Sequence, residues 1–114
     1  MGTRAATVDY LLDQLAGAGP VTARKMFGEY GLYLEGRMFA LVCDDQLFLK
    51  PTAGGLALLG TPTEGFPYPG AKACYLLGED LIEDADFLAQ LARTTASELP
   101  LPKPKKPKAP RKQA

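Results

Sequence analysis

The stretch between Lys25 and Lys50 constrains the fold more than any other part of the chain, because it consists of short β-prone runs separated by turn residues. Runs and turns alternate along it in this order: GLYL at 31–34, EG at 35–36, RMFALVC at 37–43, DDQ at 44–46 and LFLK at 47–50. Gly and Asp tolerate the backbone angles of tight turns, and connections this short join only antiparallel neighbours. The stretch therefore predicts an antiparallel β-meander.

The residues before the meander predict a helix followed by one more strand. Apolar residues at positions 8, 11, 12 and 15 have the spacing of an amphipathic helix, which residues 17–20 (GAGP) end. Thr3 or Thr7 is the expected cap of its first turn. Residues 21–27 then predict a first strand that enters the sheet.

The residues after the meander predict a loop, a further strand and a closing helix. Residues 56–59 are too few for more than a helical turn or two, and residues 61–70 (TPTEGFPYPG) read as a loop. Residues 72–77 (KACYLL) predict a strand. Asp84 is a suitable N-cap for a last helix, which Pro100 and Pro102 end.

The expected fold is α+β in two layers, with the antiparallel β-meander covered by the N-terminal and C-terminal helices. Residues 1–100 form the expected domain. Residues 101–114 form a Pro/Lys-rich basic tail, which we expect to be disordered because it has no apolar anchor from Lys103 onward. The tail carries six cations and no acid, whereas residues 1–102 hold seven cations and thirteen acids, a net charge of −6.

The cations of the tail are candidate phosphate contacts. Prolines keep such a segment extended, which suits nonspecific contact with a nucleic-acid backbone. A solubilising tail is the alternative interpretation. The candidate nucleic-acid-binding residues are Lys103, Lys105, Lys106, Lys108, Arg111 and Lys112.

The motif FGEYGLY, followed by EGRMFALVCDDQLFLK, closely resembles the signature of the TfoX N-terminal domain family. The resemblance extends more loosely over residues 5–99 and includes an aromatic-Pro-Tyr segment at 66–68. The signature positions are Phe27, Gly28, Tyr30, Gly31, Tyr33, Gly36, Phe39, Asp45 and Lys50, with Leu32, Ala40, Leu47 and Leu49 between them.

The resemblance implies a bacterial regulator of competence genes without catalytic residues, and it makes a homodimer plausible. Full-length members pair this domain with a second, helical domain, so a stand-alone N-terminal domain is expected here. Our first hypothesis is a regulatory protein that acts through protein partners, with nonspecific nucleic-acid contact by its tail. The alternative is a homodimerising interaction module with no direct DNA role.

An enzyme that uses carboxylates is the third hypothesis. Asp44-Asp45 and Glu79-Asp80 are carboxylate pairs, but both fall where turns are expected. The chain has no histidine, which leaves a nucleophile without its usual base. We expect no enzyme activity, no metal site and no cofactor. Cys43 and Cys74 are expected to be buried free thiols rather than a disulfide.

Four aromatic residues are candidates for stacking bases or docking a partner: Tyr30, Tyr33, Phe66 and Tyr68. Core packing is the favoured interpretation for most of them. Arg24, Lys25 and Arg37 are cations that would flank such a surface.

The sequence also predicts a location in the cell. No run of about 18 apolar residues is present, and residues 1–14 lack a secretory apolar region. A cytoplasmic protein without membrane contact is therefore expected.

Overall fold

Short turns build the centre of the sheet, as the sequence predicts, although Gln46, predicted as part of the second turn, is the first residue of a strand. The computed structural model describes residues 3–26 and 28–99. Strands β2 (Glu29–Leu34), β3 (Arg37–Cys43) and β4 (Gln46–Leu49) follow one another as antiparallel neighbours. Both connecting turns have left-handed backbone angles, with φ of 54° and 81° at Glu35 and Gly36 and of 54° and 60° at Asp44 and Asp45. Such turns match the twist of the strands that they join, so the predicted meander is confirmed.

Three further strands extend the meander into a six-stranded antiparallel sheet with the order β1-β2-β3-β4-β6-β5. The predicted first strand is β1 (Val21–Met26), and the predicted strand after the loop is β6 (Cys74–Leu77), which pairs with β4. Strand β5 (Thr63–Gly65) pairs with the outer edge of β6 and lies inside the segment predicted as loop. Its backbone pairing with β6 makes this segment a strand, because the three residues TEG have little β propensity of their own.

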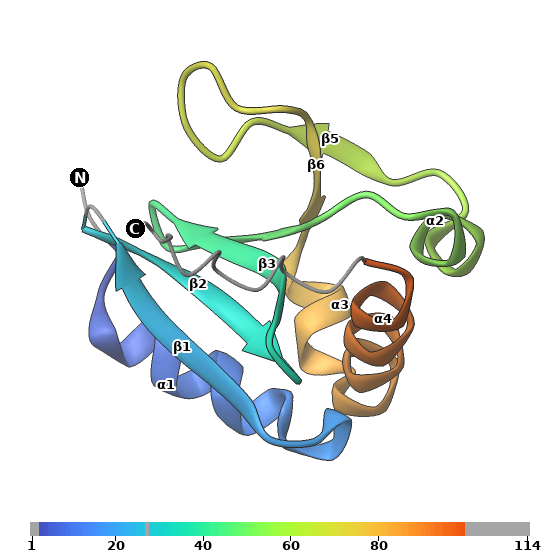
Figure 1. The fold of residues 1–114 in the computed structure, drawn as a ribbon, viewed down its shortest axis with the longest axis horizontal. Helices are drawn as coiled ribbons and strands as arrows, with labels where there is room; N and C mark the ends of the chain where they lie inside the picture. Colours follow the sequence, from blue (N-terminus) through green and yellow to red (C-terminus); the bar gives the residue numbers. More distant parts are fainter. Residues whose placement is uncertain (1–2, 27, 100–114) are drawn as a thin grey trace, which may run out of the picture.

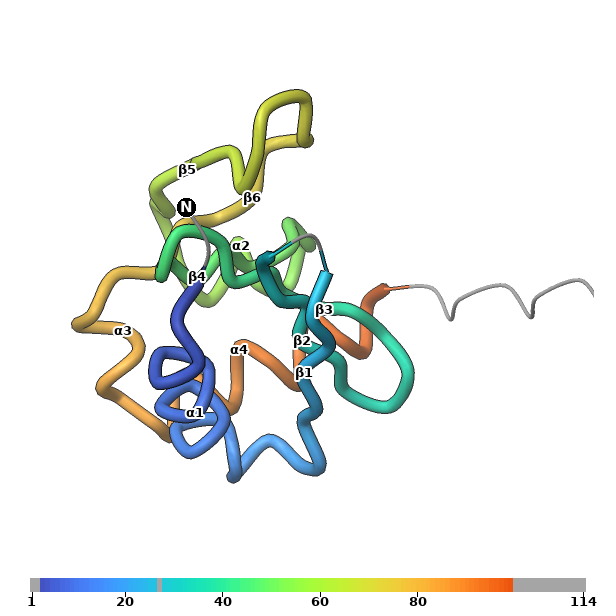
Figure 2. Tube along the Cα trace, turned by 90° about the vertical axis from the view of Figure 1, so that its left-hand side faces the viewer, coloured from blue at the N-terminus to red at the C-terminus, as the bar shows by residue number. Residues whose placement is uncertain are grey.

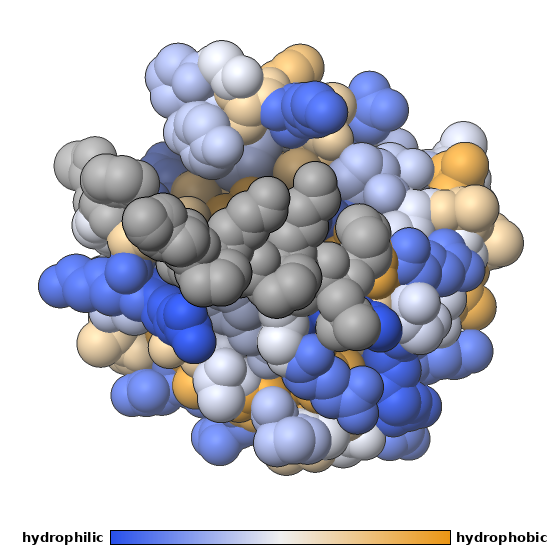
Figure 3. Space-filling model, in the orientation of Figure 1, coloured by the Kyte–Doolittle hydropathy of each residue, from blue (hydrophilic) through white to orange (hydrophobic). Residues whose placement is uncertain are grey.

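Helices cover one face of this sheet (Figure 1). These are α1 (Ala5–Gln14), the short 3-10 helix η1 (Ala16–Ala18) and α4 (Ala85–Glu98), with α3 (Glu79–Glu83) between them in space. Helix α2 (Ala53–Leu59) packs beside α4, and Figure 3 shows hydrophobic residues at the surface over it. The predicted α+β fold, with terminal helices over a meander, is confirmed. Helix α3 was not predicted, because its five residues are too few to show a period.

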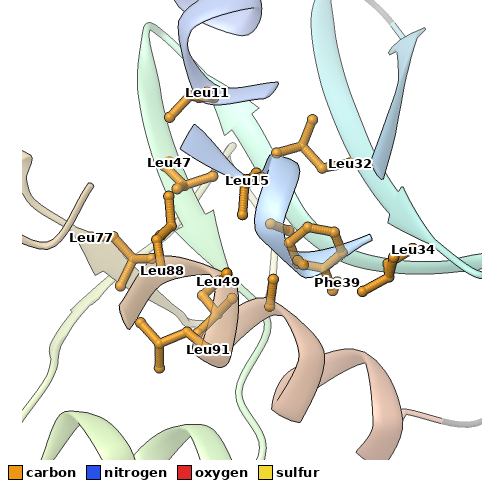
Figure 4. Packing of buried hydrophobic residues seen from close by; sticks show 14 of the residues in the cluster. Leu11, Leu15, Leu32, Leu34, Phe39, Leu47, Leu49, Leu77, Leu88 and Leu91 are labelled. Atoms are coloured by element: carbon orange, nitrogen blue, oxygen red, sulfur yellow. The ribbon is translucent and has the colours of Figure 1, made fainter. Parts of the chain in front are cut away.

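The main core lies between the sheet and the helices, and its leucines point toward one another from both layers (Figure 4). Each fully buried leucine of this kind stabilises the fold by about 1.5–3 kcal/mol relative to an exposed one. The labelled residues of the core are Leu11, Leu15, Leu32, Leu34, Phe39, Leu47, Leu49, Leu77, Leu88 and Leu91.

A β-bulge in β3 decides which residues enter this core. Leu32 pairs with Ala40 but Tyr33 pairs with Met38, so Phe39 is one extra residue on β3. Phe39 and Ala40 therefore both belong to the helix-side core, while Met38 and Leu41 belong to the opposite face.

The start of α1 differs from the prediction. Its N-cap residue is Arg4, which makes no side-chain cap bond. The Thr3 hydroxyl instead contacts the Glu29 carboxylate and accepts from the Asp45 backbone N–H, and the Thr7 hydroxyl donates to the Asp45 carboxylate. The expected Thr3 or Thr7 cap is therefore wrong. The cap of the last helix is confirmed, because the Asp84 carboxylate accepts from the backbone N–H of Phe87 at 3.2 Å.

Candidate binding face

The face of the sheet opposite the helices is the candidate site, and we call it the open face. Alternate residues of each strand point to it, because successive side chains of a strand lie on opposite faces. A second, smaller apolar cluster forms its floor: Leu41, Cys43, Phe48 and Cys74, with Met26, Met38 and Leu76 packed against them. Every residue of this cluster lies on a strand, and none of its residues belongs to a helix.

The connection between β5 and β6 forms one wall of the open face and stands away from the rest of the domain in two perpendicular views (Figures 1 and 2). In this connection Pro67 is buried, whereas Phe66 and Tyr68 are 62% and 53% exposed. The preference for core packing is therefore wrong for these two aromatic residues. A buried proline between them holds the segment in place while both rings remain accessible.

A hollow of about 420 Å³ lies between this wall and the strands, lined by Met26, Glu29, Leu41, Cys43 and Tyr68. Apart from the Glu29 carboxylate, its lining side chains are apolar or weakly polar. That carboxylate is engaged with the Thr3 hydroxyl and the Asp44 backbone N–H. The volume falls in the range of binding pockets for small molecules and large side chains.

Cations line the hollows that adjoin this one. Lys50 and Lys72 line a neighbouring hollow of about 350 Å³, which shares Leu41 and Tyr68 with the first. Arg24, Arg37 and Lys50 line another of about 650 Å³. The three hollows thus form a continuous surface with an apolar floor and a cationic rim.

Gly31 on β2 leaves the space that the methionine side chains of the floor occupy. A Cβ atom at this position would lie 2.7 Å from the Met38 sulfur and 3.2 Å from the Met26 sulfur. Glycine therefore lets both thioethers lie across the strand. Methionine adapts its shape to different partners, so this floor suits an adaptable binding surface.

The predicted aromatic and cationic candidates do not all lie on one face of the sheet. Tyr33 lies on the open face, and the Arg24 guanidinium stacks over its ring at 5.1 Å from the centroid, a cation–π contact. Tyr30 instead packs against the helix-side core. Lys25 follows Arg24 on β1 and therefore points to the other face. Arg37 donates from Nη1 to the carbonyl oxygen of Ala96 at 3.0 Å.

Acidic residues gather on the opposite layer. Seven of the thirteen acids belong to α1, α3 or the first turn of α4, including its cap: Asp9, Asp13, Glu79, Asp80, Glu83, Asp84 and Asp86. The net negative charge of the domain is therefore concentrated on the helical layer, away from the cationic rim. The overall charge of zero does not reveal this separation of acids from cations.

The predicted carboxylate pairs have structural roles. Asp44 and Asp45 form the turn between β3 and β4, and Asp45 also accepts hydrogen bonds from Arg4 and Thr7. Glu79 and Asp80 lie in the first turn of α3, where acidic side chains complement the helix dipole. Asp45 and Glu79 both line a hollow of about 380 Å³. Within residues 3–26 and 28–99, no group of three or more carboxylate or thiol side chains is arranged to hold a metal ion.

The two cysteines are free and buried. Cys43 pairs with Gln46 across β3 and β4, whereas Cys74 precedes the Tyr75 that pairs with Leu49. The two thiols thus lie near opposite ends of β4 and on strands that are not neighbours. The expectation of free thiols is confirmed. Burial raises the pKa of Cys43 to about 11, with the charge of Glu29 adding to the shift.

The remaining predicted positions are placed as follows. Gly28 and Gly36 have left-handed φ values of 82° and 81°, and the Lys50 backbone N–H donates to the Phe39 carbonyl oxygen at 2.9 Å. Phe27 and all six candidate cations of the tail, from Lys103 to Lys112, lie outside the described residues. Within the part of the chain that the structure describes, no helix is long and apolar enough to cross a membrane.

Sequence reasoning missed Met26, Met38, Leu41, Phe48 and Lys72 as residues of the site. The available signal was the run 37–43, which is apolar at almost every position rather than at alternate ones. Such a run indicates a strand with apolar surroundings on both faces.

Comparison with known proteins decides the family. The model of the TfoX N-terminal domain matches residues 13–99. The chain belongs to the TfoX N-terminal domain family. The match covers the sheet, the open face and α4, and it confirms the resemblance that the glycine and aromatic motif indicates. A similar protein is the "uncharacterized 12.7 kDa protein in trpE 5'region" of Spirochaeta aurantia. It is 40% identical over 108 residues, which cover 95% of this chain and 93% of that protein.

Proposed function

We propose that this TfoX N-terminal domain protein is a non-catalytic bacterial regulator of the cytoplasm that acts by binding a protein partner on the open face of its sheet. One observation carries the proposal: helices cover one side of the sheet, whereas the other side combines a methionine-containing apolar floor with a cationic rim. Exposed aromatic rings such as those of Phe66 and Tyr68, which lie beside this floor, mark an interaction site. Regulation of competence genes is the context that the family resemblance suggests for this binding.

The non-catalytic part of the proposal is supported by what the candidate carboxylates do. Both oxygens of Asp45 accept hydrogen bonds that hold the start of α1. The buried thiols have raised pKa values, which oppose the formation of a nucleophilic thiolate.

A photo-crosslinking experiment in cells tests the partner. A photoreactive phenylalanine analogue replaces Tyr68 on the open face or, as matched control, Tyr10 on α1, which is 46% exposed. We expect a protein adduct from position 68 that survives nuclease treatment and is lost when Lys72→Glu is added. Equal adducts from both positions, or none from position 68, would overturn the proposal.

Nonspecific nucleic-acid contact by the tail is a second part of the proposed function. The described chain ends near the rim, because Leu99 lines the same hollow as Arg24 and Lys50. The tail cations of residues 103–112 therefore follow directly after a cationic part of the domain.

Fluorescence anisotropy with DNA and RNA across a salt series tests this part. We compare the full chain with a full-length variant in which the six tail cations are glutamine. Six neutralised phosphates would give a slope of log K against log salt of roughly −5. Binding that is unchanged in the variant would assign the contact to the folded domain, and absence of binding at low salt would remove nucleic acid from the function.

A homodimer through the sheet edges is the alternative. Edge strand β5 has three residues, and antiparallel pairing of β1 with its copy would bring Arg24 and Lys25 near their counterparts. Like charges on an edge strand oppose such pairing. Sedimentation velocity at several concentrations distinguishes this alternative, because a dimer that the Lys25→Glu change strengthens would support it.

A further inference from the structure

We propose that the partner segment bound by the open face is an acidic peptide with one large apolar side chain, which enters the hollow formed by Met26, Leu41, Cys43 and Tyr68. This inference rests on the proposed function and adds the chemistry of the partner. It follows from three properties of the surface: the polarity of the hollow, the position of the cations and the segregation of the acids.

The polarity of the hollow favours an apolar side chain over a nucleobase. A base brings several hydrogen-bonding groups that need partners when they are buried. The polar side-chain groups that line the hollow are the Glu29 carboxylate, which already binds Thr3 and Asp44, the Tyr68 hydroxyl and the Cys43 thiol, too few for the groups of a base. A phenylalanine or leucine side chain needs no such partner, and the Met26 thioether and Leu41 side chain supply the contacts.

The position of the cations favours acidic residues beside that anchor. Lys72 and Lys50 line the hollow next to the apolar one, and Arg24 lines a third hollow that shares Lys50 with it. Lys72 and Arg24 are exposed, so their charges are available to a partner. A segment that leaves the apolar hollow across the open face would thus meet these cations.

The same charges argue against the protein's own tail as the occupant. Residues 103–112 carry six cations and no acid, so the rim would repel them. The acids of α1 and α3 lie on the helical layer, which would repel an acidic peptide and direct it to the open face.

The probe is a short synthetic peptide with a central phenylalanine between runs of aspartate and glutamate, titrated into the full-length protein. Methyl-labelled methionine reports the contact, because the chain has only three methionines and two of them, Met26 and Met38, lie on the open face. Met→Leu variants assign the signals. We expect saturable shifts of the Met26 and Met38 methyl signals, with affinity in the micromolar range.

Matched variants and peptides make the test specific. Lys72→Glu and Arg24→Glu should each weaken binding about 5-fold, and Lys25→Glu, the neighbour of Arg24 on the other face, should change it less than about 2-fold. A peptide with serine in place of phenylalanine should lose the methionine shifts, and a lysine-for-glutamate peptide should not bind.

Two outcomes would overturn the inference. The first is equal binding of the phenylalanine and serine peptides, which leaves only nonspecific charge attraction. The second is binding of single-stranded DNA or RNA at the same methionines in place of the peptide. If the crosslink from position 68 is found but the acidic peptide does not bind, the proposed function stands and the partner chemistry is wrong.

Discussion

The carboxylate of Asp45 accepts a hydrogen bond from the backbone N–H of Arg4 at 2.9 Å, so a turn between two strands holds the N-cap residue of a helix 41 positions earlier in the chain. The Thr7 hydroxyl donates to the same carboxylate at 2.9 Å, and the Arg4 guanidinium approaches it at 3.2 Å. One side chain thus joins the meander to the first helix.

Replacement of Asp45 by asparagine should lower the melting temperature. Asparagine keeps the left-handed backbone angle of the turn but removes the charge that attracts Arg4 and the dipole of α1. Asp44→Asn is the matched control, because it makes the same change one residue earlier in the same turn. Thermal unfolding followed by circular dichroism measures both, and an equal loss in the two variants would contradict the capping role.

The stability that Asp45 contributes should depend on pH in the acidic range. The hydrogen bonds from Arg4 and then Thr7 lower the pKa of its carboxyl group below the ordinary value of 3.8. A lowered pKa in the folded state means that the contribution is present above the unfolded pKa and is lost as the pH falls through the folded one. Urea unfolding at several pH values should therefore show the difference between wild type and Asp45→Asn shrinking below about pH 4. A difference that stays constant to lower pH would contradict this account.

The meander could be predicted from the sequence because its determinants are local. Glu35-Gly36 and Asp44-Asp45 specify their own turns, and the runs between them match β2, β3 and β4 to within two residues at each end. Structural features that depend on contacts between residues far apart in the chain could not be predicted. The cap at Arg4 depends on Asp45, and β5 is a strand only because β6 lies beside it.

The candidate site was only partly predictable for the same reason. Tyr33, Tyr68 and Arg24 were recognised as binding candidates by residue type, but their common face depends on the register of β1, β2 and β3. The bulge at Phe39 shifts that register by one residue, and no local sequence signal marks it. Tyr30 and Lys25 were grouped with Tyr33 and Arg24, although the alternation of side chains along β2 and β1 places them on the opposite face.

Replacement of Glu35 by asparagine should stabilise the protein. Glu35 has a φ of 54°, a left-handed conformation that costs a side chain such as glutamate about 1 kcal/mol and that asparagine tolerates better. The free energy of unfolding should rise by about 0.5–1 kcal/mol, and the melting temperature by about 4 °C. Glu35→Gln removes the same charge without this backbone tolerance, so an equal gain in both variants would assign the effect to charge.

The native protein should resist thiol reagents. Burial raises the pKa of the Cys43 thiol to about 11, and burial also raises that of Cys74, although the charge of Lys50 opposes this shift. At pH 8 only about 0.001 of a thiol with such a pKa is thiolate, the reactive form. Absorbance after addition of a disulfide reagent should show slow labelling in buffer and rapid labelling of both cysteines in guanidinium chloride. Rapid labelling of the native chain would contradict the burial of the two thiols.

Replacement of Arg37 by glutamine should destabilise the protein through the last helix. The Arg37 guanidinium donates to the carbonyl oxygen of Ala96 at 3.0 Å, near the C-terminal end of α4, where the helix dipole is negative. Loss of the charged donor should lower the free energy of unfolding by about 1 kcal/mol, measured by urea unfolding. Arg24→Gln makes the same change on the exposed open face and should cost less than about 0.5 kcal/mol. The cost of Arg37→Gln should also decrease at high salt, because ions screen the attraction between the guanidinium and the helix end. If the two arginine variants have the same stability at low salt, the contact with Ala96 does not hold α4 against the sheet.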